Sequence, residues 1–129
     1  MVKNSKIIVA GGSGFIGANL ISELIKNDNE VISISKSENN LKRKVKNAKY
    51  IFHDLKKPIK KDLFKVFEDV EYIINCSGYI DHSNFRNYGR EVFYDHFNSL
   101  ISLTNLAMDL KVKTFVQLGS SDEYGNNKS

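Results

Sequence analysis

The sequence has little cysteine, little proline and no long hydrophobic run in its 129 residues. Its one cysteine, Cys76, cannot form a disulfide within the chain, which is typical of a protein from a reducing compartment. No apolar stretch approaches the roughly 20 residues that a membrane-spanning helix needs. The apolar stretch from Ile7 to Ala10 ends at two glycines and is too short for a signal peptide. We therefore expect a cytoplasmic protein that does not associate with a membrane.

Length and composition place the chain among soluble globular proteins. Hydrophobic residues make up 41% and charged residues 26%, which favours neither a disordered nor a membrane class. There are no internal repeats, no low-complexity tract and no linker, and the one proline, Pro58, falls between predicted elements. A chain of this length forms one domain with a core but is too short for two. We expect one domain over residues 1–129, complete or partial.

Positive charge is concentrated in one stretch of the chain, which carries a formal net charge of +4. Such a run is usually a solvated surface, and it can also provide a field that attracts a polyanion. A nucleic-acid partner is not expected, because no aromatic residues are spaced through the run as a stacking platform. Phosphorylated small molecules fit it better. The cations are Lys36, Lys42, Arg43, Lys44, Lys46, Lys49, Lys56, Lys57, Lys60 and Lys61.

Short β-branched runs alternate with segments of helical period, which is the pattern of a parallel α/β sheet. Strands are predicted at residues 6–10, 31–35, 50–52, 72–75 and 114–118, and helices at 15–26, 63–67 and 91–110. Crossovers between parallel strands are almost always right-handed, which favours strand order 3-2-1-4-5. The predicted fold is a doubly wound parallel sheet.

A glycine-rich turn joins the first predicted strand to the first predicted helix. It reads Gly11, Gly12, Ser13, Gly14, Phe15, Ile16 and Gly17. Gly11 permits a tight turn, Gly14 lets backbone N–H groups approach a pyrophosphate, and Gly17 lets the helix pack closely on the strand. The N-terminus of the helix then faces the anion with its unpaired N–H groups and positive dipole end. The strand, turn and helix together predict a dinucleotide-binding site.

The run from Val9 to Gly17 resembles the G-x-x-G-x-x-G turn of the extended short-chain dehydrogenase/reductase family, whose members modify nucleotide-activated sugars. The resemblance covers essentially the whole chain. It implies a Rossmann-like, NAD(P)-binding domain over residues 1–129 that is incomplete at its C-terminus, without the later strands and the substrate domain.

The end of the second strand departs from this family, which usually has a carboxylate there to bind the adenosine ribose of NAD. Here the position holds Ser35, followed by Lys36 and Ser37. A hydroxyl and an ammonium can accept the 2′-phosphate that a carboxylate would repel. Although Glu38 is close by in the sequence, the departure favours NADP over NAD as the cofactor.

Two further segments match places where the family contacts its cofactor. Asp54 and Leu55 follow the third strand, where the resemblance implies contact with the adenine; an aspartate there can also simply cap a turn. Cys76, Ser77 and Gly78 follow the fourth strand, where small residues lie against the phosphates and nicotinamide ribose. Cys76 itself is interpreted as a small hydrophobic residue rather than a nucleophile.

The resemblance also implies catalytic groups, namely a serine or threonine, a tyrosine and lysine in a Y-x-x-x-K motif, and a helix asparagine. Asn98 lies in the middle of the long helix, where a short amide is a poor choice unless it has a role. Ser120, with Ser121 as second choice, follows the fifth strand as the hydroxyl that polarises the reacting oxygen. The segment from Tyr124 to Lys128 spells Y-x-x-x-K, but Gly-Asn-Asn is a poor helix sequence, so we do not expect it to be the working motif.

Without a helical Y-x-x-x-K, the chain alone is not expected to catalyse. We expect the cofactor-binding part of an epimerase, dehydratase or reductase acting on a nucleotide-activated sugar by hydride transfer, and a homodimer through the long helix when full length. The alternative is a non-catalytic dinucleotide-binding or redox-sensing module. His53, His82 and His96 have no spacing that suggests a metal site.

Overall fold

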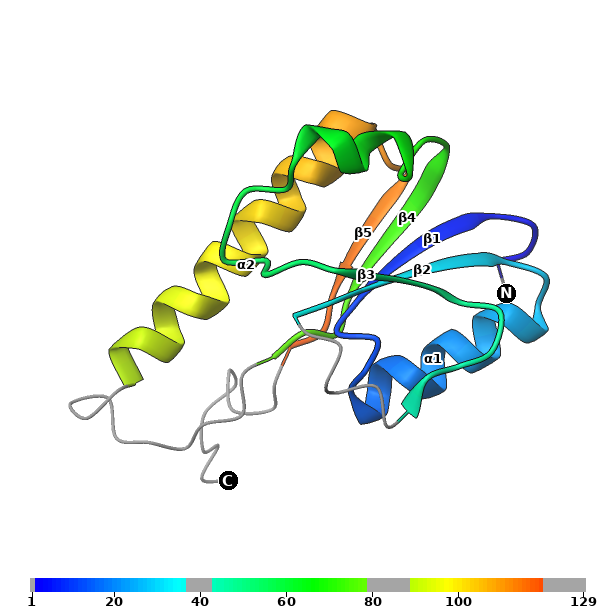
Figure 1. Ribbon diagram of the computed structural model, residues 1–129, viewed down its shortest axis with the longest axis horizontal. Helices are drawn as coiled ribbons and strands as arrows, with labels where there is room; N and C mark the ends of the chain where they lie inside the picture. Colours follow the sequence, from blue (N-terminus) through cyan, green and yellow to red (C-terminus); the bar gives the residue numbers. More distant parts are fainter. Residues whose placement is uncertain (1, 37–42, 79–88, 120–129) are drawn as a thin grey trace, which may run out of the picture.

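The computed structural model describes residues 2–36, 43–78 and 89–119, and in them eight elements alternate along the chain (Figure 1). The strands are β1 (Lys6–Ala10), β2 (Glu30–Ser35), β3 (Lys49–Phe52), β4 (Val70–Asn75) and β5 (Thr114–Gln117). The helices are α1 (Phe15–Lys26), the short 3₁₀ helix η2 (Lys61–Lys65) and α2 (Gly89–Leu110).

The five strands form one parallel sheet in the order β3-β2-β1-β4-β5, which confirms the predicted topology. Ile8 of β1 pairs with Ile32 of β2 on one side and with Ile73 of β4 on the other. All three side chains are fully buried, as is typical of the central strands of a parallel sheet that is covered on both faces. The order changes direction between β1 and β4, where ligands of open α/β sheets bind.

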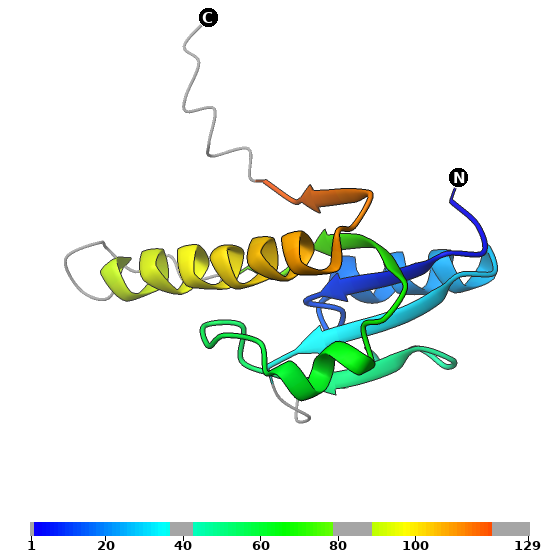
Figure 2. The same cartoon turned by 90° about the horizontal axis from the view of Figure 1, so that it is seen from above.

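Helices cover both faces of the sheet (Figures 1 and 2). Successive side chains of a strand point to opposite faces. Ile7 and Val9 therefore pack with Ile21 and Leu24 of α1. On the other face Ile8 and Ala10 join a larger cluster with Leu103, Leu106 and Ala107 of α2 and with Phe67, which follows η2. The two clusters fix both helices against the sheet and direct the ends of β1 and β4 toward the same edge.

The predicted elements have small errors at their ends. The boundaries of β1 and α1 agree with the prediction, but the helix predicted at 63–67 is a 3₁₀ helix over Lys61–Lys65. Phe67 is fully buried behind it, and the chain reverses at Asp69, whose φ is +61°, before β4 begins at Val70. The hydrophobic anchor thus lies after the helix rather than in it. Strands β2 and β3 begin one residue earlier than predicted, β4 and α2 begin two residues earlier, and β5 ends one residue earlier.

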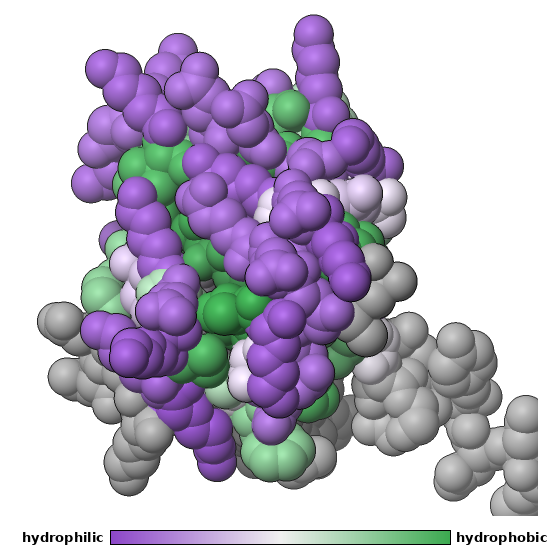
Figure 3. Space-filling view, turned by 90° about the vertical axis from the view of Figure 1, so that its right-hand side faces the viewer, coloured by the Kyte–Doolittle hydropathy of each residue, from purple (hydrophilic) through white to green (hydrophobic). Residues whose placement is uncertain are grey.

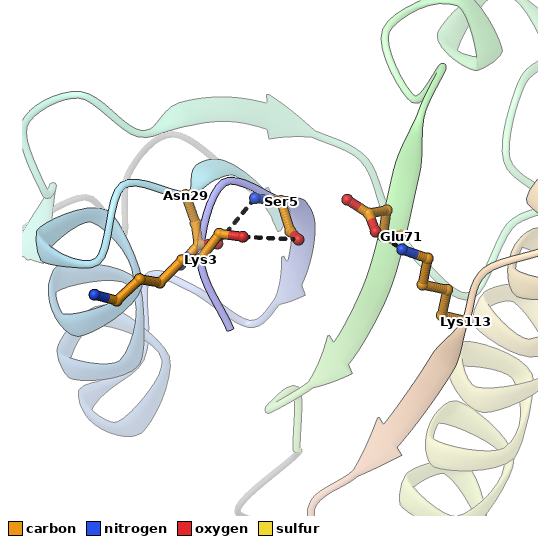
Figure 4. Close-up of polar contacts among 5 residues, drawn as sticks. All are labelled: Lys3, Ser5, Asn29, Glu71 and Lys113. Carbon is orange, nitrogen blue, oxygen red and sulfur yellow. Dashed lines mark hydrogen bonds and ion pairs between the residues drawn. The ribbon is translucent and has the colours of Figure 1, made fainter. Parts of the chain in front are cut away.

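Polar contacts fasten the amino ends of the strands, at the opposite end of the sheet from its carboxyl edge (Figure 4). The side chain of Asn29 accepts a hydrogen bond from the Ser5 backbone N–H at 3.1 Å and donates to the carbonyl of Leu24 at 2.9 Å. Glu71 of β4 forms an ion pair with Lys113, which directly precedes β5. These contacts tie the start of β1 to the end of α1, and β4 to β5.

The described cations of the lysine-rich stretch all lie on the surface, as expected of a solvated run. On the side of the molecule shown in Figure 3, hydrophilic side chains surround smaller hydrophobic areas. Within the described ranges, no helix is long and apolar enough to cross a membrane.

Candidate functional site

A cavity of about 520 Å³ opens at the carboxyl edge of the sheet. All five strands contribute to its wall through their last residues or the loops that follow them, and the N-terminal half of α2 completes it. Its size falls within the usual range of small-molecule sites, roughly 300 to 1,000 Å³. It lies at the point where the strand order reverses, so the fold places it where a nucleotide is expected.

The glycine turn after β1 is compact because three of its glycines leave no room for a side chain. Gly11 has φ +76° and approaches the loop after β4 so closely that a Cβ would lie 2.7 Å from the Ser77 nitrogen. A Cβ on Gly17 would lie 2.4 Å from the Gly11 oxygen, and one on Gly12 would lie 2.3 Å from the Ser33 hydroxyl. Gly11 and Gly17 thus have the conformational and packing roles that the sequence predicts for them.

The start of α1 next to this turn suits an anion. Gly14 is the N-cap and gives the helix no side-chain cap, and no acidic residue stands in the first turn. The first intrahelical bond runs from the Ala18 N–H to the Gly14 carbonyl at 3.0 Å. The preceding amides of the helix therefore keep their donors available, at the positive end of the helix dipole. Ser13 and Gly14 line the cavity, while Phe15 and Ile16 are exposed beside it.

The end of β2 contributes Ser35 and Lys36 to the cavity wall. Ser35 is only 4% exposed, and its hydroxyl lies 3.4 Å from that of Ser33. Lys36 is exposed, so the ammonium rather than the hydroxyl is the accessible polar group here. Ser37, predicted to join them, lies outside the described residues.

The loop after β3 brings Asp54 and Leu55 to the same cavity. One carboxylate oxygen of Asp54 accepts a hydrogen bond from the Lys56 backbone N–H at 3.2 Å, so this side chain caps a turn. Leu55 is buried against the cluster beneath α2. Asp54 therefore caps a turn, as the alternative interpretation predicted. It also lies at the cavity, as the resemblance implied.

A buried amide that sequence reasoning missed organises the end of β4. Asn75 is 3% exposed, and its side-chain oxygen accepts hydrogen bonds from the backbone N–H and the hydroxyl of Ser77 at 3.0 and 2.5 Å. Its nitrogen donates to the Gln117 side chain of β5 at 2.7 Å. Both residues line the cavity, so Asn75 fixes the loop of Ser77 and Gly78 relative to two strands.

Cys76 also lines the cavity and packs against the cluster beneath α1. Burial raises the pKa of its thiol, which lowers the thiolate fraction and hence its reactivity as a nucleophile. This agrees with its interpretation as a small hydrophobic residue. A Cβ added to Gly78 would meet nothing nearer than the Cε1 of His96 at 3.8 Å, so the loop is open on that side.

Only one side of α2 faces the cavity. The cavity is lined by Asp95, His96, Phe97, Ser99 and Leu100, with Phe97 at the margin, whereas Asn98 lines a second depression with Pro58 and Phe64. Each residue turns a helix by about 100°, which puts Asn98 opposite the middle of the cavity-lining residues. The structure does not bring Asn98 to the glycine turn, so its catalytic role stays a prediction. His96 is the polar side chain that sequence reasoning overlooked.

The predicted catalytic hydroxyls Ser120 and Ser121 lie outside the described residues. In the ranges 2–36, 43–78 and 89–119, no group of three or more histidine, cysteine, aspartate or glutamate side chains is placed to hold a metal ion. The described site therefore consists of the glycine turn, the ends of the strands and one side of α2.

Comparison with known proteins gives this arrangement a context. A family model described as the NAD dependent epimerase/dehydratase family matches residues 7–129. No curated protein matches the chain.

Among solved structures, UDP-N-acetylglucosamine 4-epimerase from Methanobrevibacter ruminantium M1, in complex with UDP-N-acetylmuramic acid, is 24% identical with a TM-score of 0.80, over 99% of this chain and 42% of its own. UDP-glucose 4-epimerase from Bifidobacterium longum, in complex with NAD+ and UDP, is 20% identical with a TM-score of 0.81, over 97% and 40%. Pen from Bacillus thuringiensis gives 20% identity and a TM-score of 0.81 over the same shares. The chain spans about two fifths of the length of these structures, and the likeness is one of fold.

Proposed function

Because the chain belongs to the NAD-dependent epimerase/dehydratase family, we propose that it is the cofactor-binding part of an enzyme that acts on a nucleotide-activated sugar. The reaction would pass a hydride between the sugar and the nicotinamide, as epimerases, dehydratases and reductases of sugar nucleotides do. Two of the structural neighbours are UDP-sugar 4-epimerases, one of them in complex with NAD+ and UDP, and they support the substrate class and the cofactor.

The observation that carries the proposal is the cavity between the glycine turn and the loop after β4. The pyrophosphate of the cofactor would lie at the uncapped N-terminus of α1, where Ser13 and Gly14 line the wall. The adenine would lie toward Asp54 and Leu55, and the nicotinamide ribose toward Cys76, Ser77 and Gly78. The close approach of Gly11 to Ser77 fits this placement, because any side chain there would push the two loops apart.

The cofactor supplies the hydride chemistry, and the chain orients it. Asn75 would hold the Ser77 loop in place through its three hydrogen bonds. We propose Ser120, with Ser121 as second choice, as the hydroxyl that polarises the reacting oxygen, because both follow Gln117, which lines the cavity. Asn98 remains a candidate for a supporting role, although its side of α2 does not favour it.

For the cofactor itself we propose NADP ahead of NAD. The described residues at the end of β2, Ser35 and Lys36, include no carboxylate, and the accessible group there is the ammonium of Lys36. A cation stabilises the 2′-phosphate of NADP, which a carboxylate would repel.

We further propose that the protein is cytoplasmic and that α2 contacts a second copy of the chain. Apolar side chains that recur along α2 support this contact, since Phe93, Phe97, Ile101 and Met108 are each about half exposed or more. A contiguous exposed apolar stripe is typical of a protein interface. Sedimentation equilibrium of the wild type and of Phe97→Glu would show a dimer that the variant weakens.

Calorimetric titration of the chain with NADPH and with NADH tests the central proposal. We expect saturable one-to-one binding of at least one of them, tighter for NADPH. Absence of saturable binding to either cofactor, in a chain that unfolds cooperatively, would overturn the proposed function.

A further inference from the structure

The buried amide of Asn75 belongs to a chain of hydrogen bonds whose direction is fixed by the backbone. Its side-chain oxygen accepts from the Ser77 backbone N–H at 3.0 Å, and a backbone N–H can only donate. The Asn75 nitrogen therefore faces Gln117 and donates to its side-chain oxygen at 2.7 Å. The Gln117 nitrogen in turn donates at 2.7 Å to the Leu118 backbone carbonyl, which can only accept. A backbone group at each end thus excludes the flipped orientation of either amide.

This direction decides what Ser77 can offer to a ligand. The Ser77 hydroxyl lies 2.5 Å from the same Asn75 oxygen, which can only accept, so the hydroxyl donates its proton there. Only the lone pairs of the Ser77 oxygen remain, and Ser77 is a partly buried residue of the cavity wall. Ser77 is therefore an acceptor toward the cavity and not a donor.

Gln117 has the opposite character. Its amide nitrogen carries two N–H groups, and only the one bonded to Leu118 has an acceptor among the described residues. Gln117 is exposed and lines the cavity at the end of β5, while Asn75 holds its side-chain oxygen. Gln117 can therefore donate one hydrogen bond to a ligand.

An acceptor and a donor on neighbouring strands do not suit a phosphate. The phosphates of a dinucleotide carry no proton at neutral pH and only accept hydrogen bonds, so their oxygens would repel the lone pairs of Ser77. Two neighbouring hydroxyls of a sugar ring do suit this pair. One hydroxyl can donate to the Ser77 oxygen while the other accepts from the Gln117 nitrogen.

We propose that Ser77 and Gln117 bind the two hydroxyls of the ribose on the nicotinamide side of the dinucleotide, and that Asn75 is the positioning residue that sets the direction of both contacts. The proposal rests on the proposed function, because it needs a dinucleotide in the cavity. The cavity then has two chemically distinct parts, with the phosphates at the start of α1 and a neutral sugar at the ends of β4 and β5. The close approach of Gly11 to the Ser77 nitrogen keeps these parts adjacent.

Comparison of ADP with ADP-ribose isolates this ribose, because the two ligands share the adenosine and the diphosphate. The wild type, Ser77→Ala and Gln117→Met are titrated with both ligands, and thermal unfolding is followed to confirm the fold. We expect the wild type to bind ADP-ribose more tightly than ADP. In each variant this gain should fall by about three- to tenfold, the scale of one lost neutral hydrogen bond, while ADP binding stays within about twofold. Thr114→Val, at the other end of β5, is the control and should change neither.

Asn75→Asp tests the positioning role. A carboxylate still accepts from Ser77 but cannot donate to Gln117, so the Gln117 amide loses its fixed direction. We expect the gain of ADP-ribose over ADP to fall by as much as in Gln117→Met. The double variant should lose no more than either single one, since both act on one contact. A merely structural role of Asn75 would instead weaken ADP and ADP-ribose alike.

Gln117→Glu makes the converse change on an exposed residue, so it keeps the test decisive if Asn75→Asp does not fold. Its carboxylate accepts from Asn75 but donates nothing to a ligand, and the same gain should be lost.

A gain that survives in Ser77→Ala and Gln117→Met would overturn the proposal. Equal losses for ADP and ADP-ribose would also overturn it, because the two side chains would then act on the diphosphate or the adenosine. A wild type that binds both ligands equally well overturns this inference alone. A wild type that binds neither of them, nor NADPH, overturns the proposed function as well.

Discussion

Lys56 and Asp95 form an ion pair that joins the loop after β3 to α2. Both residues line the cavity, and both side chains are partly buried. The same loop is fastened to α2 by a hydrogen bond of 3.4 Å from the Ser102 hydroxyl to the Lys57 carbonyl. Since the loop carries Asp54 and Leu55, these contacts set the position of the wall against which we place the adenine.

The ion pair leads to a prediction on affinity. Asp95→Asn should weaken dinucleotide binding by about two- to fivefold, because a partly exposed ion pair contributes at most about 1 kcal/mol. Calorimetry at low and high salt would measure the loss, which should shrink as salt increases. Lys57→Gln removes a neighbouring charge without touching this pair and serves as the control. If the charge exchange Lys56→Glu with Asp95→Lys recovers none of the affinity, the ion pair does not position the loop.

The sequence predicted most of the fold because the signals were local. The boundaries of β1 and α1 followed from an apolar run, a glycine turn and a helical period, all within about 20 residues. The strand order followed from the handedness of crossovers. The bounds of the 3₁₀ helix were harder to predict, because the hydrophobic residue that anchors it, Phe67, lies after the helix. Phe67 is buried in the cluster beneath α2, which local sequence does not reveal.

Of the geometry of the candidate site, the sequence predicted only that of the glycine turn, where the backbone requires glycine. The tight turn at Gly11, where φ is +76°, and the close packing of Gly17 were inferred from spacing alone. The orientation of α2 was not, because apolar residues lie all round it: Leu103 and Ala107 are buried, whereas Phe93 and Phe97 are exposed. Asn98 was therefore chosen for its type, and His96, two residues earlier, was overlooked. The hydrogen bond of Asn75 with Gln117 joins distant parts of the chain and leaves no local signal.

Two glycines of the site should differ in their effect on stability. Gly12→Ala should lower the free energy of unfolding by about 1–3 kcal/mol, because its Cβ would lie 2.5 Å from the Ile21 Cδ1 as well as against Ser33. Gly78→Ala meets only ordinary contacts and should leave stability unchanged within about 0.5 kcal/mol. Urea denaturation measures both. Equal stability of the two variants would mean that the turn is less tightly packed than described.

The ion pair of Glu71 with Lys113 predicts a pH dependence of stability. Lys113 lowers the pKa of the Glu71 carboxyl, and Glu71 in turn raises the pKa of the Lys113 ammonium. Because its pKa is lowered in the folded state, the Glu71 carboxyl contributes its full stabilisation at pH values above the usual carboxyl pKa of about 4. This stabilisation is lost as the pH falls through the lowered pKa.

Thermal unfolding from pH 7 to pH 3 should therefore show a small difference between the wild type and Glu71→Gln that disappears at the acid end and in high salt. Glu68→Gln is the control, since Glu68 is exposed and forms no ion pair among the described residues. A difference that persists below the titration of the carboxyl would show that Glu71 stabilises the fold by packing.

A negative charge at Ser13 directly tests the proposed position of the pyrophosphate. Ser13 lines the cavity directly before the N-cap of α1. Ser13→Asp should weaken NADPH binding by about tenfold or more through repulsion in a partly enclosed site. The same carboxylate should leave the melting temperature unchanged or raise it, because an anion near a helix N-terminus is stabilising. Ser13→Asn matches its size without the charge and should stay within about threefold of the wild type.

The measurement is a titration that follows the fluorescence of NADPH itself, since the chain contains no tryptophan. We predict weaker NADPH binding by Ser13→Asp with undiminished stability. Equal NADPH affinity in Ser13→Asp, Ser13→Asn and the wild type would contradict this prediction, because the pyrophosphate would then lie away from the start of α1.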